Sequence, residues 1–265
     1  MIQFEAIQSG SSGNSILVRD DETCILVDAG ISCKRITEEL RRLGIDPRSL
    51  HGIFITHEHI DHVAGLTLTA SKYGIPVFTS FGTFERIEHS QRDPDGVLRP
   101  LFHPVRAGEE YTVGTLAVRP IRTFHDAEEP LAYRFASGGT SFAVFTDSGS
   151  FTDETVEMLS GLTAALLESN HDIRMLEVGP YPYELKRRIL SDLGHLSNDA
   201  CADLVRRIYS PSLKTIVLGH LSENNNYPDI ARVTMENRLR EMGVLSEVSL
   251  YVAERGVKTP MFTLG

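Results

Sequence analysis

The chain contains one stretch that decides how it folds, Gly52-Ile53-Phe54-Ile55-Thr56-His57-Glu58-His59-Ile60-Asp61-His62. The first five residues predict a short buried strand that runs directly into His57. His57 and His59 are two residues apart in an extended segment, so their side chains project to the same side. Asp61 and His62 follow as the chain turns into a helix. Four potential metal ligands therefore cluster at the end of one strand.

The residue types in this cluster indicate the kind of metal site. Imidazole and carboxylate groups suit Zn²⁺, Mn²⁺ or Fe²⁺, and the absence of cysteine favours an open catalytic site over a closed structural zinc site. A histidine-rich turn can also arise by chance or as a solvated loop, and a single pair of histidines would not exclude that. The longer pattern H-x-H-x-D-H, at the exit of a buried strand, favours a metal centre.

Other apolar strands also end in ionisable residues. Asp28 follows one strand, Asp147 a second and His220 a third, and His125 occupies the corresponding place after residues 116–121. An unpaired charge in such a half-buried place is costly, so its repeated placement suggests a shared cationic partner. Taken alone, His125 or His220 would more often be an ordinary buried histidine. Together they extend the predicted metal site.

The hydrophobic pattern predicts an α/β fold. Each half of the chain begins with strands and then mixes strands with helices, as two packed sheets with outer helices require. Gly and Pro separate the expected elements, and we leave 89–110 as a loop. The expected strands are 4–7, 15–18, 24–28, 52–56, 76–79, 116–119, 132–135, 142–146, 164–168 and 215–218. The expected helices are 34–43, 62–73, 152–159, 198–209 and 230–242.

Composition excludes several classes of protein. Hydrophobic residues make up 41% and charged residues 23% of the 265 residues, and no apolar run is long enough to span a bilayer. The amino terminus lacks the pattern of a secretory signal, and three scattered cysteines do not form a disulfide framework, so we expect a cytoplasmic protein. The formal charge of 26 − 36 = −10 argues against a broad basic face that coats nucleic acid. It does not exclude a nuclease.

In these residues and their order, the sequence resembles the metallo-β-lactamase superfamily. The resemblance implies a four-layer αββα sandwich of two mixed β-sheets with outer helices, and one domain over residues 1–265. It also implies two divalent metal ions, Zn, Mn or Fe, and a hydrolase that uses a metal-bound hydroxide. One ion would be held by His57, His59 and His125, the other by Asp61, His62 and His220. Asp147 would bridge the two ions, and Asp28 would orient ligands.

Features outside the ligand set bear on the substrate. His195 and Ser197 lie at the start of a predicted helix, in a motif that resembles one with which phosphodiesterase branches contact the scissile phosphate. His195 would then stabilise charge or protonate the leaving oxygen, although a histidine can also lie near a helix start without such a role. Small residues in the segment 9–15 let backbone amides approach an anion. The expected phosphate contacts from this segment are Ser9, Ser11, Ser12 and Asn14.

Together with residues 168–172 and 219–225, these motifs resemble the bacterial YycJ/WalJ branch of the superfamily. That resemblance implies a 5′-to-3′ DNA exonuclease that acts on DNA ends, without the inserted cap domain of related nucleases. Asp61 and His195 are the expected catalytic residues. His171 would line the site or would satisfy a buried loop. The segment 181–188 combines two tyrosines with Lys186, Arg187 and Arg188; it could hold nucleic acid or be a solvated helix face.

Two alternatives to a nuclease remain open from the sequence. One is a thioesterase or lactamase-like hydrolase that acts on a small molecule, because the superfamily fold alone does not choose a substrate. The other is a metal-stabilised binding protein without activity, which the complete set of seven ligands disfavours. The sequence does not distinguish DNA from RNA as the substrate. It identifies neither the native metal nor the oligomeric state.

Overall fold

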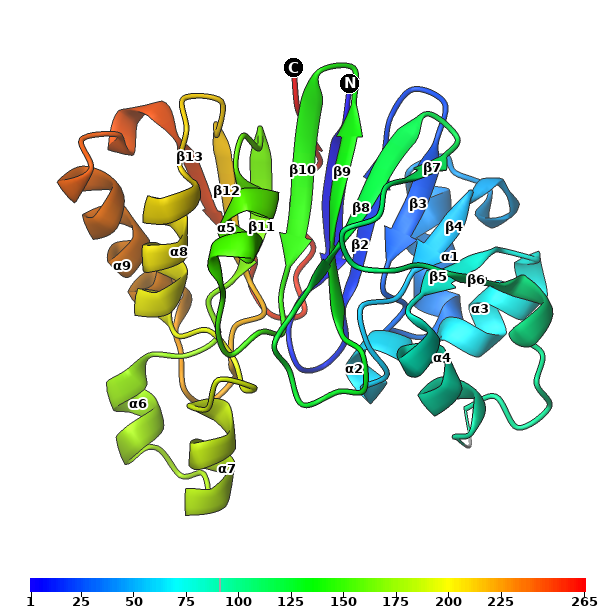
Figure 1. Ribbon diagram of the computed structural model, residues 1–265, viewed down its shortest axis with the longest axis horizontal. Coiled ribbons are helices and arrows are strands. Elements are labelled where there is room, and N and C mark those ends of the chain that lie inside the picture. Colours follow the sequence, from blue (N-terminus) through cyan, green and yellow to red (C-terminus); the bar gives the residue numbers. More distant parts are fainter. Residues whose placement is uncertain (91) are drawn as a thin grey trace.

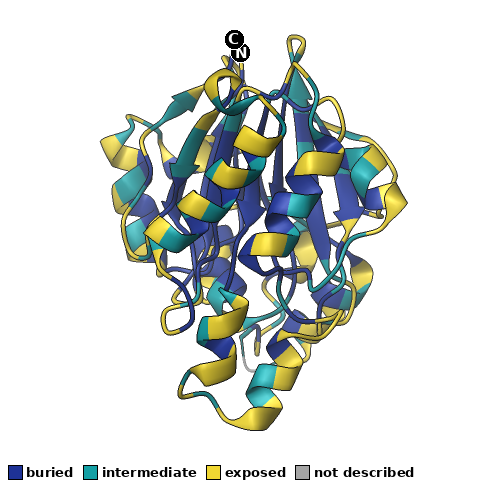
Figure 2. Cartoon of the chain, turned by 90° about the vertical axis from the view of Figure 1, so that its left-hand side faces the viewer, coloured by how far each residue is buried: buried dark blue, intermediate teal, exposed yellow. Residues whose placement is uncertain are grey.

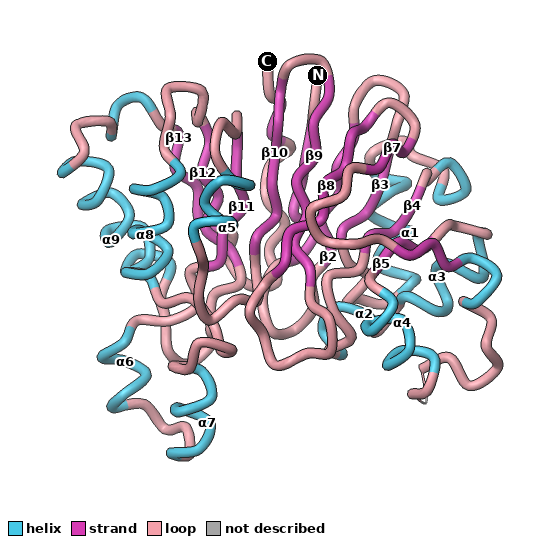
Figure 3. Tube along the Cα trace, in the orientation of Figure 1, coloured by secondary structure: helices cyan, strands magenta, loops and turns pink. Residues whose placement is uncertain are grey.

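The computed structural model describes residues 1–90 and 92–265, which form two mixed β-sheets packed face to face with helices on their outer sides (Figures 1 and 3). Each sheet has seven strands within the described residues, in the orders β14-β1-β2-β3-β4-β5-β6 and β13-β12-β11-β10-β9-β8-β7. This arrangement confirms the predicted αββα sandwich.

The first sheet combines antiparallel pairing at the amino-terminal strands with parallel pairing from β3 to β6. Its strands are β1 (Gln3–Gln8), β2 (Ser15–Arg19), β3 (Cys24–Val27), β4 (Gly52–Phe54), β5 (Val77–Thr79), β6 (Phe102–Pro104) and β14 (Phe262–Thr263). The second sheet is antiparallel from β7 to β10 and parallel from β10 to β13. Its strands are β7 (Tyr111–Val113), β8 (Leu116–Arg122), β9 (Leu131–Ser137), β10 (Thr140–Phe145), β11 (Ala164–Glu168), β12 (Thr215–Gly219) and β13 (Ser249–Val252).

Helices cover the outer face of each sheet, and two further helices project below the second sheet (Figures 1 and 2). The helices beside the first sheet are α1 (Cys33–Arg42), α2 (Ile60–Val63), α3 (Leu66–Tyr73) and α4 (Phe81–Glu88). Those beside the second are α5 (Asp153–Leu159), α8 (Asn198–Ile208) and α9 (Pro228–Glu241), and the projecting pair is α6 (Ile173–Val178) and α7 (Tyr183–Ile189). Three 3-10 helices cover Pro47–Ser49, Arg99–Leu101 and Leu245–Glu247. No helix in the described ranges is long and apolar enough to cross a membrane.

Three hydrophobic layers hold the sandwich together, because successive side chains of a strand point to opposite faces. In β3, Ile25 and Val27 pack between the two sheets, whereas Leu26 packs under the helices of the first sheet. Aromatic rings join the sheets in the middle layer, where Phe4 stacks on Phe142 at a centroid distance of 3.9 Å. Strands buried on both faces explain why the sequence shows continuous apolar runs.

Two expectations for local structure were wrong. The helix expected over 62–73 is interrupted between α2 and α3, where the backbone of Gly65 packs against the loop before α1; a Cβ there would lie 2.0 Å from the carbonyl oxygen of Ile31. Within 89–110, described except for residue 91, β6 pairs with β5 instead of forming a loop. This strand ends in a proline at the sheet edge and is too short for the sequence pattern to indicate it.

The close packing of Gly30 against the backbone of Asp61 gives a test of the contacts that position residues 57–62. A Cβ at Gly30 would lie 1.6 Å from the carbonyl oxygen of Asp61, which accepts a hydrogen bond from the backbone of Asn14. Gly30→Ala should therefore lower the free energy of unfolding by about 3 kcal/mol or more. In the matched control, Gly161→Ala, the added methyl group meets open space at a positive φ and should cost about 1 kcal/mol. Equal denaturant midpoints for the two variants would contradict this packing.

Candidate metal centre

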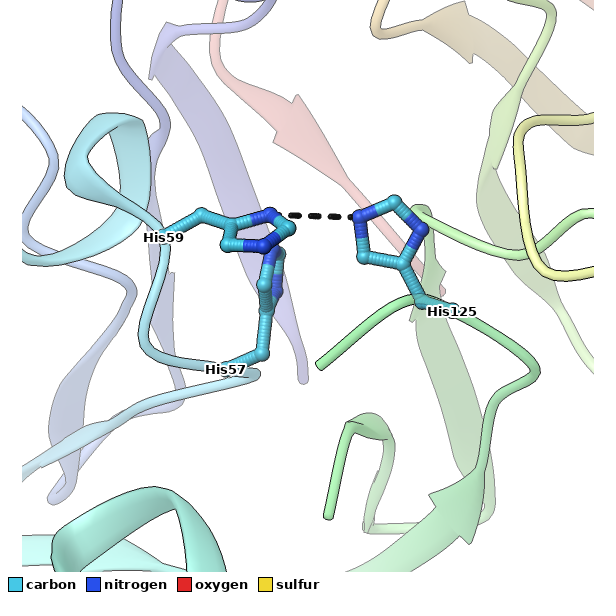
Figure 4. A group of neighbouring side chains, drawn as sticks. All are labelled: His57, His59 and His125. Carbon is cyan, nitrogen blue, oxygen red and sulfur yellow. Dashed lines mark hydrogen bonds between the residues drawn. The ribbon is translucent and has the colours of Figure 1, made fainter. Parts of the chain in front are cut away.

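The ligand run after β4 meets residues from the second sheet at one edge of the sandwich. Parallel strands place their carboxyl ends on the same edge, so residues that follow β3, β4, β10, β11 and β12 converge there. His57, His59 and His125 form one group whose ring nitrogens lie within 4.8 Å of one another (Figure 4). Nε2 of His125 is 3.3 Å from Nδ1 of His59. Three imidazoles on two separate loops therefore face one point.

A second group lies beside the first. The ligand atoms of Asp61, His62 and His220 are also within 4.8 Å of one another. The carboxylate of Asp147 reaches both groups: it forms such a set with His57 and His62, and its Oδ1 is 3.4 Å from Nε2 of His220. This is the geometry that a carboxylate shared between two metal ions requires. The structure thus brings together all seven residues expected as ligands, and their roles as ligands remain a prediction.

Several ligand atoms are buried without a hydrogen-bond partner among the described residues. They include Nε2 of His57, Nε2 of His220 and Oδ2 of Asp147. Buried polar atoms in native proteins are usually satisfied, because leaving them unpaired costs about 1–3 kcal/mol each. These three atoms belong to the groups that face a common point. The residues present therefore fit divalent metal ions.

The backbone is strained where the strands end in site residues. Among the described residues, three that are not glycine have a positive φ: Asp28 (61°), Asp147 (58°) and His220 (54°), which follow β3, β10 and β12. The left-handed region is costly for residues with a Cβ and is found mostly at functional sites. Asp147 and His220 belong to the groups described above, and Asp28 forms a hydrogen bond with His62.

Buried hydrogen bonds fix the orientation of the histidine rings. Nδ1 of His62 donates to Oδ2 of Asp28 at 2.8 Å, and Asp28 also accepts from the backbone and side chain of Thr56. Nδ1 of His125 donates to the carbonyl oxygen of Gly194 at 3.0 Å. Such partners set which ring nitrogen is free to bind a metal. The contact between Asp28 and His62 is compatible with the orienting role expected for Asp28, which stays a prediction.

Glu168 is the functional residue whose role the sequence analysis missed. It is fully buried at the end of β11, and its Oε1 accepts from Nδ1 of His195 at 2.7 Å and from Nδ1 of His220 at 2.9 Å. Its Oε2 accepts from the backbone amides of Ser148 and Leu196. The rule that identified Asp147 and His220, an ionisable residue just past an apolar strand, applies equally to Glu168. One carboxylate therefore orients both His195 and a predicted metal ligand.

Charge compensation explains the ionisation of the buried groups. Burial raises the pKa of Asp61, Asp147 and Glu168, but neighbouring histidines outweigh burial and hold all three below their ordinary values. Burial lowers the pKa of His220, but Asp147, Asp61 and Glu168 outweigh it and raise this pKa to about 10. The pKa of His57 falls because of burial and the adjacent histidines. Positive charge is thus matched to the carboxylates, and a bound metal would replace protons there.

The segment Ser9–Ser15 packs beside the metal centre and has divided roles. Ser11 lines the cleft over the site, together with His195 and Asn170. Ser9 is buried and its hydroxyl accepts a hydrogen bond from the amide of His220 at 2.9 Å. Oδ1 of Asn14 accepts a hydrogen bond from the amide of Gly10 at 2.8 Å, and the backbone amide of Asn14 donates to the carbonyl oxygen of Asp61 at 2.7 Å. Within this segment, Ser11 is therefore the side chain that faces the cleft, whereas Ser9 and Asn14 hold the site in place.

The remaining expected residues lie around the same loops. Ser12 is exposed in a pocket next to the cleft, and Ser197 is the N-cap of α8, where its hydroxyl accepts from the amide of Ala200. His171 is buried beside Ser197, and neither ring nitrogen has a partner among the described residues. Burial lowers the pKa of His171 to about 4, so this ring is neutral. Its ring nitrogens belong to none of the ligand groups found in the described ranges.

Glu168 gives a test of how the site is held together. Glu168→Gln replaces an anion that accepts four hydrogen bonds, so it should lower the free energy of unfolding by about 3 kcal/mol. It should also reduce hydrolysis about 10–100-fold, because His195 and His220 lose their orienting partner. Glu157→Gln, on an exposed position of α5, is the control and should change neither property. Wild-type stability and turnover in Glu168→Gln would exclude the orienting role.

Comparisons with known proteins identify relatives of this chain. The family described as beta-lactamase superfamily domain matches residues 23–220. The exodeoxyribonuclease WalJ of Streptococcus pneumoniae is 36% identical over 263 residues, which cover 98% of this chain and 97% of that protein. The exodeoxyribonuclease YycJ of Bacillus anthracis is 36% identical over 242 residues, covering 91% of this chain and 90% of that protein.

Among solved structures, unliganded PDE1 from yeast superposes with a TM-score of 0.73 at 13% identity, over 99% of both chains. The metallo-beta-lactamase fold protein YhfI from Bacillus subtilis superposes with a TM-score of 0.69 at 14% identity, over 98% of this chain and 99% of that chain. At this level of identity the two structures support the fold alone.

Proposed function

Because the chain belongs to the beta-lactamase superfamily and, within it, to the family of the WalJ and YycJ exodeoxyribonucleases, we propose that it is a metal-dependent phosphodiesterase that degrades DNA from an end in the 5′-to-3′ direction. The observation that carries the proposal is the placement of His195. This histidine is tied to buried Glu168 beside the ligand groups, at the cleft that a phosphodiester would enter.

Two groups of residues would hold two divalent ions, Zn, Mn or Fe, with Asp147 shared between them. The first group is His57, His59 and His125, and the second is Asp61, His62 and His220. When bound, such ions activate water and take up negative charge on phosphate oxygens. The protein positions the ligands through Asp28, Glu168 and the carbonyl group of Gly194, which fix the rings of His62, His220 and His125.

His195 is placed to act on the phosphate or the leaving oxygen. Because its Nδ1 donates to Glu168, Nε2 is the ring nitrogen left free. Nδ1 is also 3.8 Å from Oδ1 of Asp147, so the ring lies directly beside the proposed metal pair. A histidine held by a buried carboxylate can donate a hydrogen bond to a phosphate oxygen or a proton to the departing alkoxide. We assign this role to His195. Asp61, which is also a proposed metal ligand, is the second proposed catalytic residue.

The loop Ser9–Ser15 would provide further contacts to the phosphate. Ser11 faces the cleft and is the proposed direct contact, with Ser12 beside it in the adjoining pocket. Ser9 would act through the position of His220, and Asn14 through its backbone contact with Asp61. Ser197 would contribute as the N-cap of α8, two residues after His195.

Metal removal gives the first test of this proposal. The purified protein should contain two divalent ions per chain by elemental mass spectrometry, and a chelator should lower its Tm because bound metal stabilises the folded state. Asp147→Asn should lose at least half of the bound metal. Glu154→Gln, on the exposed start of α5, is the control and should keep its metal. Full metal content in Asp147→Asn would exclude the bridging role.

An end-labelled DNA assay tests the substrate. The protein should release mononucleotides from 5′-phosphorylated DNA and should leave a thioester and a β-lactam intact. His195→Ala should retain its metal and lose about 100–10,000-fold in turnover, the range expected for an acid–base or oxyanion-stabilising residue. Turnover of only the thioester or the β-lactam would instead support a small-molecule hydrolase. No hydrolysis of any substrate by the metal-loaded protein would support a binding protein.

A further inference from the structure

Helices α6 and α7 project below the second sheet (Figures 1 and 2), and α7 with the residue Tyr181 before it lines one side of the cleft over the candidate site. Tyr181, just before α7, and Leu185, Arg188 and Ile189, within it, line the cleft together with His59, Asp61 and His195. The sequence alone did not distinguish a nucleic-acid contact from a solvated helix face in this segment. The structure places one face of α7 directly at the reaction site.

The three consecutive cations of α7 point to different surroundings. Nζ of Lys186 donates to the carbonyl oxygen of Glu177 at 2.8 Å. Arg187 lies 3.7 Å from Glu184 and over the ring of Tyr183. Arg188 instead lines the cleft. Of the three, Arg188 is therefore the one that brings its charge to the cleft.

Arg188 is held next to the metal centre by Asp126. Nε and Nη2 of the guanidinium donate to both carboxylate oxygens, with Nη2 3.0 Å from Oδ1. Asp126 directly follows His125, and its Oδ1 is 3.4 Å from Nε2 of that ligand. The Arg188 side chain is half-exposed, so the ion pair is open to water and contributes little stability. An incoming anion can therefore displace the carboxylate at low cost.

A phosphate group can make the same contacts with the Arg188 guanidinium as the Asp126 carboxylate does. Arginine binds a carboxylate and a phosphate with the same bidentate geometry, so a phosphate oxygen pair can take the place of Asp126. The negative charge of the scissile phosphate would be offset by the proposed metal ions. The next anion along a DNA strand is the neighbouring backbone phosphate. In a chain of net charge −10, such a local cation offsets the repulsion between protein and strand.

We propose that Arg188 binds the backbone phosphate next to the scissile one, exchanging Asp126 for the DNA strand. The inference rests on the proposed nuclease function and adds a subsite to it. It makes Arg188 a residue that selects polymeric over small phosphodiesters, because a small phosphodiester has no second phosphate. Arg188 acts in binding, so its loss should raise KM for DNA and leave kcat unchanged.

Binding measurements on the metal-loaded protein test this subsite. The probe is a 5′-phosphorylated, phosphorothioate-protected single strand, followed by fluorescence anisotropy at several salt concentrations. Arg188→Gln should weaken binding about tenfold at low salt and reduce the slope of log K against log salt by about 0.7, the value for one phosphate contact on a single strand. Arg187→Gln removes the adjacent charge of α7 and should change neither quantity. Equal behaviour of the two variants would overturn the proposal.

A third variant separates phosphate binding from a merely structural ion pair. If Arg188 only holds α7 by pairing with Asp126, then Asp126→Asn should weaken DNA binding as much as Arg188→Gln does. If Arg188 binds phosphate, Asp126→Asn removes the competing anion, and binding should be unchanged or tighter at equal metal content. Weaker binding by metal-replete Asp126→Asn, matching Arg188→Gln, would overturn the proposal.

Turnover of bis(p-nitrophenyl) phosphate separates failure of this inference from failure of the proposed function. Arg188→Gln should lose much more of its kcat/KM on DNA than on this small phosphodiester, with the loss on DNA appearing mainly in KM. An equal loss on both substrates would place Arg188 on the scissile phosphate and contradict the neighbouring-phosphate subsite. If the wild-type protein cleaves neither DNA nor the small diester, the proposed function fails and not the assignment of Arg188 alone.

Discussion

The structure depends on how negative charge is buried at the carboxyl edge of the two sheets. Asp28, Asp147 and Glu168 are almost completely removed from water. Each carboxylate needs a partner there, because an uncompensated buried charge costs several kcal/mol. Histidines from other loops supply part of that compensation, and the unpaired ligand atoms of His57, His220 and Asp147 indicate where metal would supply the rest. The strained backbone at three strand ends follows from the same requirement, since it turns the side chains toward one point.

The sequence predicted the sandwich and the positions of the ligands for a simple physical reason. Strands buried on both faces are continuous apolar runs, and a charged residue directly after such a run stands out, as Asp147 does after β10. The same rule would have identified Glu168, but its hydrogen bonds to two histidines depend on the register of β11 and β12, which no local pattern encodes. The break at Gly65 and the edge strand β6 were missed because they are set by contacts with distant backbone. The pairing of Arg188 with Asp126, 62 residues apart in sequence, has the same origin.

Function is specified by the surroundings of the metal ligands rather than by the ligands. The superfamily uses one fold for many substrates, so the seven predicted ligands leave the substrate open. Three features narrow it: His195 tied to Glu168, Ser11 in the cleft, and a helical wall that carries Arg188. In the proposed function, each of these features would contact a phosphate or its neighbour along a strand. The full-length similarity to exodeoxyribonucleases is consistent with that arrangement.

The decisive experiment is a crystal structure of the metal-loaded protein with a phosphorothioate dinucleotide, in which the metals are located by anomalous scattering. We expect one metal peak among His57, His59 and His125 and another among Asp61, His62 and His220. We also expect the phosphorothioate between the metals and Nε2 of His195. Metal peaks outside these groups, or a phosphorothioate bound away from His195, would contradict the proposed function.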